Sequence, residues 1–118
     1  GTIGVINCWD IRYPLETLKL AQEGADIIFC PAYWYDEEYQ SRRMVQSFPQ
    51  SRASENQVYF IFCDAYADET SSWSQICSPL FLVAEAGRKE EIIAADINLT
   101  DLKESRKTFD CYPRKEKK

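Results

Sequence analysis

The sequence predicts an α/β fold in which helices pack on one face of a mixed β-sheet. An apolar strand-like run, an amphipathic segment and a second apolar run follow one another in residues 3–30, which is the order of a βαβ unit with parallel strands. A further helical segment and a third apolar run continue this alternation to residue 65. Short apolar runs separated by turn residues follow, which indicates hairpin-like strands at the end of the sheet.

The first βαβ unit is marked at both ends of its helix. Residues 3–7, IGVIN, are rich in β-branched side chains and predict a buried strand. Pro14 suits the first position of a helix and Gly24 the position just past its end, with apolar residues at three-residue spacing between them. Residues 25–30, ADIIFC, predict a second buried strand that stops at Pro31.

The next segment predicts a helix followed by a strand. From about residue 36 to residue 56 the pattern is helical, with acidic residues in the first turn, where they favour the helix dipole. Pro49 predicts a kink or a fresh helical turn within it. Residues 57–65, QVYFIFCDA, predict a third strand that is apolar enough to be covered on both faces. The polar residues 66–74 predict a loop.

The last part of the sequence predicts short strands and one more helix. Residues 75–86 predict two strands joined near Ser78 and Pro79, and residues 92–99, IIAADINL, predict a last strand. Asn98 or Thr100 can cap a helix over residues 101–107, before a charged tail that we expect to fray. We find no linker or repeat, so residues 1–118 are expected to form a single domain.

Composition excludes several classes of function. The 118 residues carry a formal net charge of −5, which argues against non-specific nucleic-acid binding. No apolar run approaches the roughly 18 residues needed to span a bilayer, so we expect no membrane partner. The chain has five cysteines, no histidine and no CxxC pair, which predicts no metal site, no cofactor, and reduced thiols in a cytoplasmic protein.

Cys8 stands in a special position within INCWDIRYP, residues 6–14. It follows a predicted strand directly and precedes a turn and a helix, at the sheet edge where α/β proteins collect catalytic groups. Backbone N–H groups of such a turn, beginning with that of Trp9, can stabilise an oxyanion. The alternative is a buried small hydrophobic residue, which is our expectation for Cys30, Cys63 and Cys77. A nucleophilic Cys8 needs a base, and the sequence offers no histidine for it.

The same region resembles the nitrilase, or carbon–nitrogen hydrolase, superfamily. The family shows a Gly-x-x-x-Cys-x-Asp-x-Arg-Phe-Pro-like turn, then Gly-Ala-Asp, a strand and Pro-x-x-Trp, then Arg-Ala-x-Glu-Asn. This sequence supplies Gly4, Cys8, Asp10, Arg12, Tyr13, Pro14, Gly24, Ala25, Asp26, Pro31, Trp34, Arg52, Ala53, Glu55 and Asn56 in the same order. WSQICSP and AADINL continue the resemblance, so that it covers nearly the whole chain.

The resemblance implies an α-β-β-α sandwich and a Glu–Lys–Cys triad, which contains no histidine. Cys8 corresponds to the nucleophile and the N–H of Trp9 to an oxyanion donor, with Asp10 as a structural support. Family members place the triad glutamate and lysine upstream of the cysteine strand, where this sequence begins. We therefore expect residues 1–118 to be the C-terminal portion of such a domain, half of the sandwich, with the N-terminal half absent.

Three further residues have two interpretations each. Arg12 either holds a substrate carboxylate, as in some family members, or forms an internal ion pair with Glu55. Glu55 is expected to be a structural support. Trp34 either lies near the mouth of the substrate pocket or belongs to the packed core.

Two functions follow from these observations. The first is a thiol amidohydrolase that acts on a C–N bond of a small amide, carbamoyl compound or nitrile through a Cys8 thioester, although this chain alone is expected to be inactive. The second is a non-catalytic fragment or degenerate paralogue that serves as an interaction domain. Half a sandwich leaves one sheet face uncovered, so we also expect a homo-oligomer, a dimer or higher.

Overall fold

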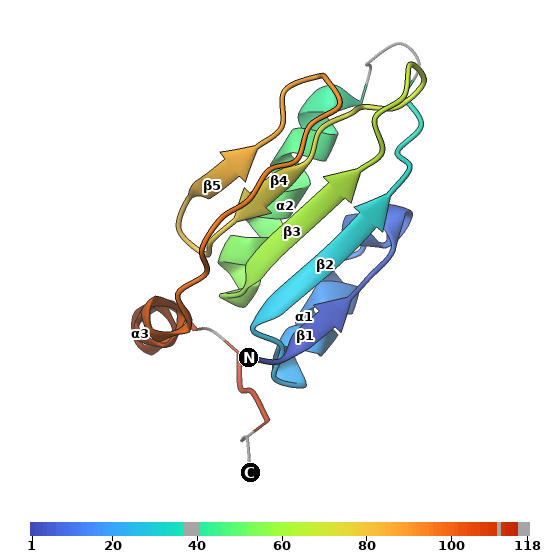
Figure 1. The fold of residues 1–118 in the computed structure, drawn as a ribbon. Coiled ribbons are helices and arrows are strands. Elements are labelled where there is room, and N and C mark those ends of the chain that lie inside the picture. Colours follow the sequence, from blue (N-terminus) through green and yellow to red (C-terminus); the bar gives the residue numbers. More distant parts are fainter. Residues whose placement is uncertain (37–40, 111, 116–118) are drawn as a thin grey trace.

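Five strands form one mixed sheet in the computed structural model, which describes residues 1–36, 41–110 and 112–115 (Figure 1). The strands are β1 (Ile3–Val5), β2 (Ile27–Ala32), β3 (Tyr59–Asp64), β4 (Gln75–Cys77) and β5 (Leu82–Glu85). They lie in sequence order, with β1, β2 and β3 parallel and β4 antiparallel to both of its neighbours. The predicted fold class, including the hairpin of β4 and β5, is confirmed.

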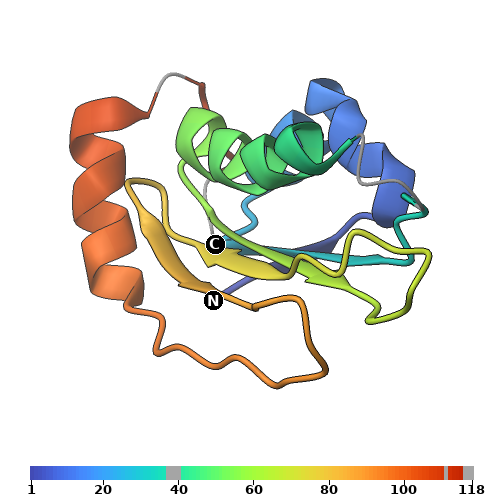
Figure 2. The same cartoon turned by 90° about the horizontal axis from the view of Figure 1, so that it is seen from above.

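The helices are η1 (Cys8–Arg12, a 3₁₀ turn), α1 (Pro14–Gln22), α2 (Arg42–Asn56) and α3 (Leu99–Phe109). Figure 2 shows α1 and α2 on one face of the sheet, while α3 stands beside it. No helix in the described parts of the chain combines the length and the apolar content that crossing a bilayer requires.

The main core lies between the sheet and the helices α1 and α2. Ile28 of β2 and Phe60 and Phe62 of β3 point to this side and are at most 1% exposed. Val45 and Ala53 of α2 pack in the same cluster. The core fixes the position of the strand ends, because the register of β2 and β3 is set by which side chains are buried.

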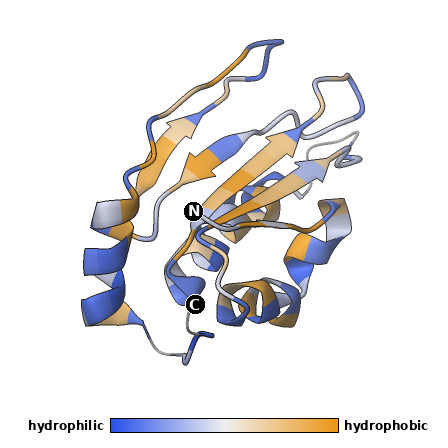
Figure 3. Ribbon diagram, turned by 60° about the horizontal axis from the view of Figure 1, so that its bottom comes forward, coloured by the Kyte–Doolittle hydropathy of each residue, from blue (hydrophilic) through white to orange (hydrophobic). Residues whose placement is uncertain are grey.

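The opposite side of the parallel strands is an apolar surface, which we call the open face and define by Ile3, Val5, Phe29, Ile61 and Cys63. Pairing puts Val5 beside Phe29 and Phe29 beside Ile61. Ile3 and Val5 are 61% and 62% exposed. Figure 3 shows the strands as largely hydrophobic ribbons. The expectation that Cys63 is buried is wrong, because the alternation of β3 turns Cys63 onto this face, where it is exposed.

β2 continues through Pro31 to Ala32, two residues beyond the predicted end of this strand. The oxygen of Phe29 accepts a hydrogen bond from the N–H of Ile6, so the odd positions of β2 direct their backbone groups toward β1. β1 ends before it reaches the level of Pro31, and the missing N–H of the proline therefore breaks no ladder bond.

α2 differs from its prediction at both the start and the middle. It begins at Arg42, and residues 37–40, where the sequence predicts an acidic first turn, lie outside the described residues. Pro49 lies buried inside α2 and does not divide it into two helices. Burial of the face that carries Val45 and Ala53 outweighs the loss of one backbone hydrogen bond in this helix.

Residues 92–98 form no strand in the described structure and Leu99 already belongs to α3, so the predicted last strand is wrong. Ile93 is half-buried while Ile92 is 96% exposed, which reproduces the alternation of the sequence without a hydrogen-bonded ladder. Figure 2 shows this segment returning on the side of the sheet away from α1 and α2. It ends at Asn98, whose Oδ1 accepts from the N–H of Thr100 at 2.9 Å and caps α3 as predicted.

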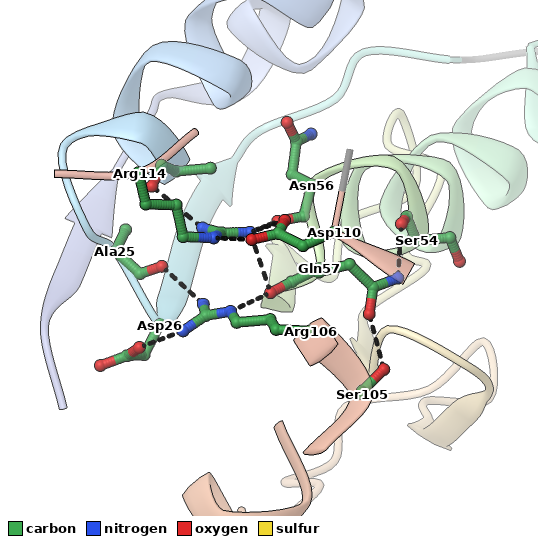
Figure 4. A network of polar contacts seen from close by, with 10 residues as sticks. Ala25, Asp26, Ser54, Asn56, Gln57, Ser105, Arg106, Asp110 and Arg114 are labelled. Carbon is green, nitrogen blue, oxygen red and sulfur yellow. Dashed lines mark hydrogen bonds and ion pairs between the residues drawn. The ribbon is translucent and has the colours of Figure 1, made fainter. Parts of the chain in front are cut away.

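Two arginines attach the C-terminal segment to the body of the fold (Figure 4). Arg106 of α3 binds the carboxylate of Asp26 at 2.8 Å and donates to the backbone oxygens of Ala25 and Gln57 at 3.0 and 2.9 Å. Arg114 donates to the backbone oxygen of Ala21 at 2.9 Å. These contacts bind the starts of β2 and β3 and the end of α1 to the C-terminal residues.

Candidate active site

Cys8 is the first residue of η1 and follows β1 after two residues. It is one of three non-glycine residues among the described positions with a positive φ, which is 46°. The buried side chains of Ile6 and Ile11 anchor the chain on either side, while the thiol itself is half-buried. A left-handed residue at a strand-to-helix turn presents its side chain at the edge of the sheet, which is the geometry of a nucleophile elbow.

Asp10 closes this turn from within. Its Oδ2 accepts from the N–H of Asn7 at 3.0 Å, and its own N–H donates to the oxygen of Asn7 at 3.0 Å. Its backbone oxygen then accepts from the N–H of Tyr13 at 2.9 Å. The carboxylate of Asp10 therefore contacts the backbone of the elbow itself.

Arg52 of α2 holds the other end of the turn. Its Nε donates to the oxygen of Ile11 at 2.9 Å and its Nη2 to the oxygen of Arg12 at 3.3 Å. Its Nη1 pairs with Glu55 Oε1 at 2.9 Å. The interpretation of an ion pair between Arg12 and Glu55 is thus wrong, because Glu55 pairs with Arg52 one helical turn away. The i, i+3 spacing of these two residues in the sequence is the signal that could have indicated this pair.

An aromatic stack lies beside Cys8. The Arg12 guanidinium lies 4.4 Å from the centre of the Trp9 ring, and the Trp9 and Trp34 rings stack at 5.1 Å with 21° between their planes. Trp9 is 50% exposed, whereas Trp34 is 2% exposed. Trp34 is therefore a buried residue behind Trp9, which favours its interpretation as part of the packed core.

Asp64 joins two loops at the carboxyl ends of β2 and β3. One oxygen accepts from the backbone N–H of Trp34 at 2.8 Å, and the other accepts from the hydroxyl of Ser71 at 2.5 Å. The sequence alone indicates no role for Asp64, because a single acidic residue at the end of an apolar strand carries no distinctive spacing.

A polar cavity of about 360 Å³ lies at the same end of β3. Its described lining consists of Asp64, Tyr66, Ser72, Ser74, Ala86 and residues 89–91. None of these comes from the Cys8 turn. Within the described residues, no group of three or more side chains is suited to hold a metal ion.

The buried thiols differ from Cys8 in their surroundings. Burial, with a smaller contribution from Cys8, raises the pKa of Cys30 to about 12, and burial raises the pKa of Cys77 to about 12. The Cys30 thiol donates a weak hydrogen bond to the backbone oxygen of Cys8 at 3.7 Å. These two thiols stay protonated at neutral pH and are inert packing groups, as predicted.

Comparison with known proteins identifies the family. Residues 1–107 match the family model described as carbon–nitrogen hydrolase. The chain is 32% identical over 112 residues to a deaminated glutathione amidase of Synechocystis and 31% identical over 110 residues to a 2-oxoglutaramate amidase of Bacillus subtilis. These matches cover 90% and 89% of this chain but only 40% and 41% of the relatives, so the chain spans about two fifths of their length.

Solved structures agree with the sequence comparison. Nit3 of Saccharomyces cerevisiae, a member of the nitrilase superfamily, superimposes with a TM-score of 0.82 at 29% identity, over 92% of this chain and 42% of that chain. The NitFhit protein of Caenorhabditis elegans gives a TM-score of 0.82 at 22% identity, over 91% and 27%. On the family match and this shared fold, the chain belongs to the carbon–nitrogen hydrolase family.

Proposed function

We propose that this chain carries the nucleophile of a thiol amidohydrolase. The single observation that supports this most strongly is the positive φ of Cys8 in the turn that begins two residues after β1, in a member of the carbon–nitrogen hydrolase family. Residues that adopt a disfavoured backbone conformation cluster at functional sites, and Cys8, unlike Gln57 at the end of α2, is not a helix C-cap.

In the proposed reaction the Cys8 thiolate attacks the carbonyl carbon of a small amide. A C–S bond forms, the C–N bond breaks, and the amine leaves with a proton. Water then cleaves the thioester to a carboxylic acid and returns the thiol. The base and the cation that assist these steps are, by the family resemblance, a glutamate and a lysine of an upstream half of the sandwich, so the 118 residues alone are inactive.

The Trp9 N–H is the proposed oxyanion donor. The first N–H groups of a helical turn have no partner within that turn, and Trp9 is the second residue of η1. Its N–H follows Cys8 directly and is therefore close to the carbon that the thiol attacks. A backbone donor in a fixed turn needs no reorganisation when charge develops on the oxygen.

Arg12 is the proposed partner of a substrate carboxylate. Its guanidinium is held over the Trp9 ring at 4.4 Å, next to the proposed oxyanion donor, and the residue is exposed. The similar amidases include one named for 2-oxoglutaramate and one for deaminated glutathione, and both compounds carry a carboxylate as well as an amide. We therefore favour a carboxylate-bearing amide over a carbamoyl compound or a nitrile.

A second candidate function is an interaction domain without catalysis. It is favoured by the open face, where Ile3 and Val5 are more than half exposed. We propose that this face is covered by self-association or by the other half of the sandwich. For either function we place the protein in the reducing cytoplasm, since the described cysteines carry free thiols.

Trapping of the acyl enzyme tests the proposal. The complete polypeptide that contains this chain is mixed with 2-oxoglutaramate or glutamine-like amides, quenched in acid and digested, and the mass of the Cys8 peptide is measured. We expect an acyl adduct on Cys8 and ammonia release, both abolished by Cys8→Ser and retained by Cys63→Ser. Ammonia release that survives in Cys8→Ser contradicts the nucleophile, and no turnover of any amide, carbamoyl or nitrile substrate favours the interaction domain.

A further inference from the structure

Trp9 contacts one exposed side chain and one buried side chain. On its outer side lies the Arg12 guanidinium, on the exposed surface of η1. On its inner side lies the Trp34 ring, at 5.1 Å and nearly parallel. Because Trp9 directly follows Cys8, the position of its ring is coupled to the peptide that links the two residues.

Trp34 is fixed by three hydrogen bonds that come from different elements. Its backbone N–H donates to Asp64 at 2.8 Å, its indole Nε1 donates to Ser41 Oγ at 3.1 Å, and its backbone oxygen accepts from the N–H of Ser71 at 3.0 Å. The ring also contacts Phe62 in an edge-on arrangement at 6.4 Å. Trp34 therefore has little freedom to move, and it limits the movement of the Trp9 ring that stacks on it.

Asp64 connects Trp34 to the end of strand β3. It is the last residue of β3 and is 8% exposed, and both carboxylate oxygens accept hydrogen bonds from neighbouring loops. A buried carboxylate is retained only where donors compensate its lost hydration. Here the donors are the backbone of Trp34 and the hydroxyl of Ser71, so the charge holds the loop after β2 against the loop after β3.

The Cys8 conformation needs such support. A non-glycine residue at φ 46° relaxes to the ordinary region unless its surroundings hold it there. Arg52 fixes the end of the turn at Ile11 and Arg12, and Asp10 fixes its start at Asn7. The stack on Trp34 is the contact that holds the side chain of Trp9, the residue that follows the nucleophile.

We propose that Trp34, anchored by Asp64, is a positioning residue for the reaction: it holds Trp9, and through it the direction of the N–H that receives the oxyanion. This inference rests on the proposed function. It assigns Trp34 a role through Trp9 and not through contact with substrate, and it gives Asp64 a part in the site although the cavity at Asp64 shares no residue with the Cys8 turn.

The test compares Trp34→Leu, Trp34→Phe and Asp64→Asn, with Trp73→Phe as the matched control, because Trp73 contacts Arg42 and is not in the stack. The first readout is the far-ultraviolet exciton couplet that a stacked indole pair gives in circular dichroism. We expect Trp34→Leu to abolish it and Trp73→Phe to leave it unchanged. The coupling falls steeply with distance, so the 5.1 Å separation of the Trp9 and Trp34 rings makes this signal a measure of their contact.

The second readout is kinetic. In the complete polypeptide, Trp34→Leu is expected to lower kcat by about 10-fold to 100-fold with less than about a twofold change in KM, since misplacement of a catalytic group by about an ångström costs rate and not ground-state binding. Trp34→Phe keeps a stacking ring and is expected to recover most of kcat, with Asp64→Asn in between. A lost couplet with unchanged kcat overturns the positioning role.

The third readout separates this inference from the proposed function. Iodoacetamide alkylation of Cys8 is measured against that of Cys63 in the same sample, and needs no turnover. We expect Trp34→Leu to change the Cys8 rate at least about fivefold, because the exposure and direction of the thiol depend on the turn. If the amidase assay fails for the wild type, an unchanged Cys8 rate still overturns the inference, and a changed rate supports it.

Discussion

At the scale of single residues, Cys8 adopts a backbone conformation that its own side chain disfavours. The left-handed region costs an L-residue with a Cβ about 1–2 kcal/mol, whereas glycine enters it freely. At φ 46° Cys8 therefore lowers the stability of the fold, which is consistent with the proposed role of Cys8 as the nucleophile.

This cost can be measured. We expect Cys8→Gly to be more stable to urea than Cys8→Ala by about 1 kcal/mol, because both remove the thiol and only glycine relieves the strain. Cys30, in the middle of β2, is the control. There Cys30→Gly is expected to be the less stable of the pair, by about 0.5–1 kcal/mol. A Cys8→Gly variant that is less stable than Cys8→Ala contradicts a strained elbow.

Cys30 and Cys77 make the stability of the fold depend on alkaline pH. Burial raises the pKa of both thiols from 9.0 to about 12. Below pH 9 the folded and unfolded chains are both protonated and the full stability is present. Between pH 9 and 12 only the unfolded chain loses these protons, so the unfolding free energy falls by about 1.4 kcal/mol per pH unit for each thiol.

Urea unfolding at about pH 8 and about pH 10.5 measures this change of the unfolding free energy with pH. Subtracting the wild-type value from that of each variant cancels the contribution of the other titrating groups. Cys30→Ala and Cys77→Ala are each expected to reduce the change with pH, while Cys63→Ala, which removes an exposed thiol, leaves it as in the wild type. Equal slopes in all four proteins show that burial does not hold these protons.

The local sequence could indicate which residues are candidates for the site, but not whether their side chains are buried or exposed. The position of Cys8 after a strand and before a proline-initiated helix is local, and the sequence alone makes the residue a candidate nucleophile on that ground. The exposure of Cys63 and the burial of Trp34 depend on which sheet face the helices cover and on the stack with Trp9. Both are tertiary properties that a strand pattern does not contain.

At the scale of elements, α3 is attached by polar contacts more than by apolar packing. Leu102 is its one buried apolar side chain among the described residues, whereas Arg106 joins Asp26, Ala25 and Gln57 (Figure 4). The ion pair with Asp26 is largely shielded from water, with side chains 15% and 7% exposed. Removal of one partner leaves buried acceptors without a donor.

Arg106→Met is therefore expected to release α3 at a cost of about 2–4 kcal/mol, with faster hydrogen exchange of the amides of residues 99–109. The control is Lys107→Met, which removes an exposed cation whose pair with Glu104 lies on the surface, and which is expected to cost under about 0.5 kcal/mol. Slow exchange of α3 in Arg106→Met shows that Leu102 alone holds the helix.

The elements that the sequence misplaces share one physical cause. Pro31 is compatible with strand β2 because β1 ends before it reaches the level of this proline. Pro49 is compatible with helix α2 because it lies on the buried face of that helix. Residues 92–99 alternate like a strand, yet they lack a partner to pair with. Propensity and periodicity describe the chain by itself, whereas pairing and coverage are decided by the rest of the fold.

At the scale of the whole molecule, the sheet is covered unequally. α1 and α2 bury one side, and on the other side the open face keeps Ile3 and Val5 more than half exposed. The fold class, the parallel strands at the start and the hairpin-like strands that follow could be predicted from the alternation of elements and from the resemblance. The extent of the open face could not, since it depends on the path of residues 86–98 after β5.

The open face predicts self-association of the 118-residue chain, since burial of apolar surface is the main driving force for association. Sedimentation equilibrium is expected to show a dimer or higher species, and alkylation of Cys63 to slow as the protein concentration rises, because Cys63 lies on that face beside Pro31. Val5→Glu is expected to shift the equilibrium toward monomer at least about tenfold, because it places a charge at the contact.

The matched control is Leu15→Glu, which adds the same charge on α1, on the helix side of the sheet, where Leu15 is 72% exposed against 62% for Val5. If association runs through the open face, Leu15→Glu keeps both the oligomer and the protection of Cys63. If instead the two variants dissociate alike, the helices form the contact. A monomer at high concentration with Cys63 alkylated at a constant rate means that residues 86–98 already shield the sheet enough, and the expectation of a homo-oligomer is then wrong for this chain.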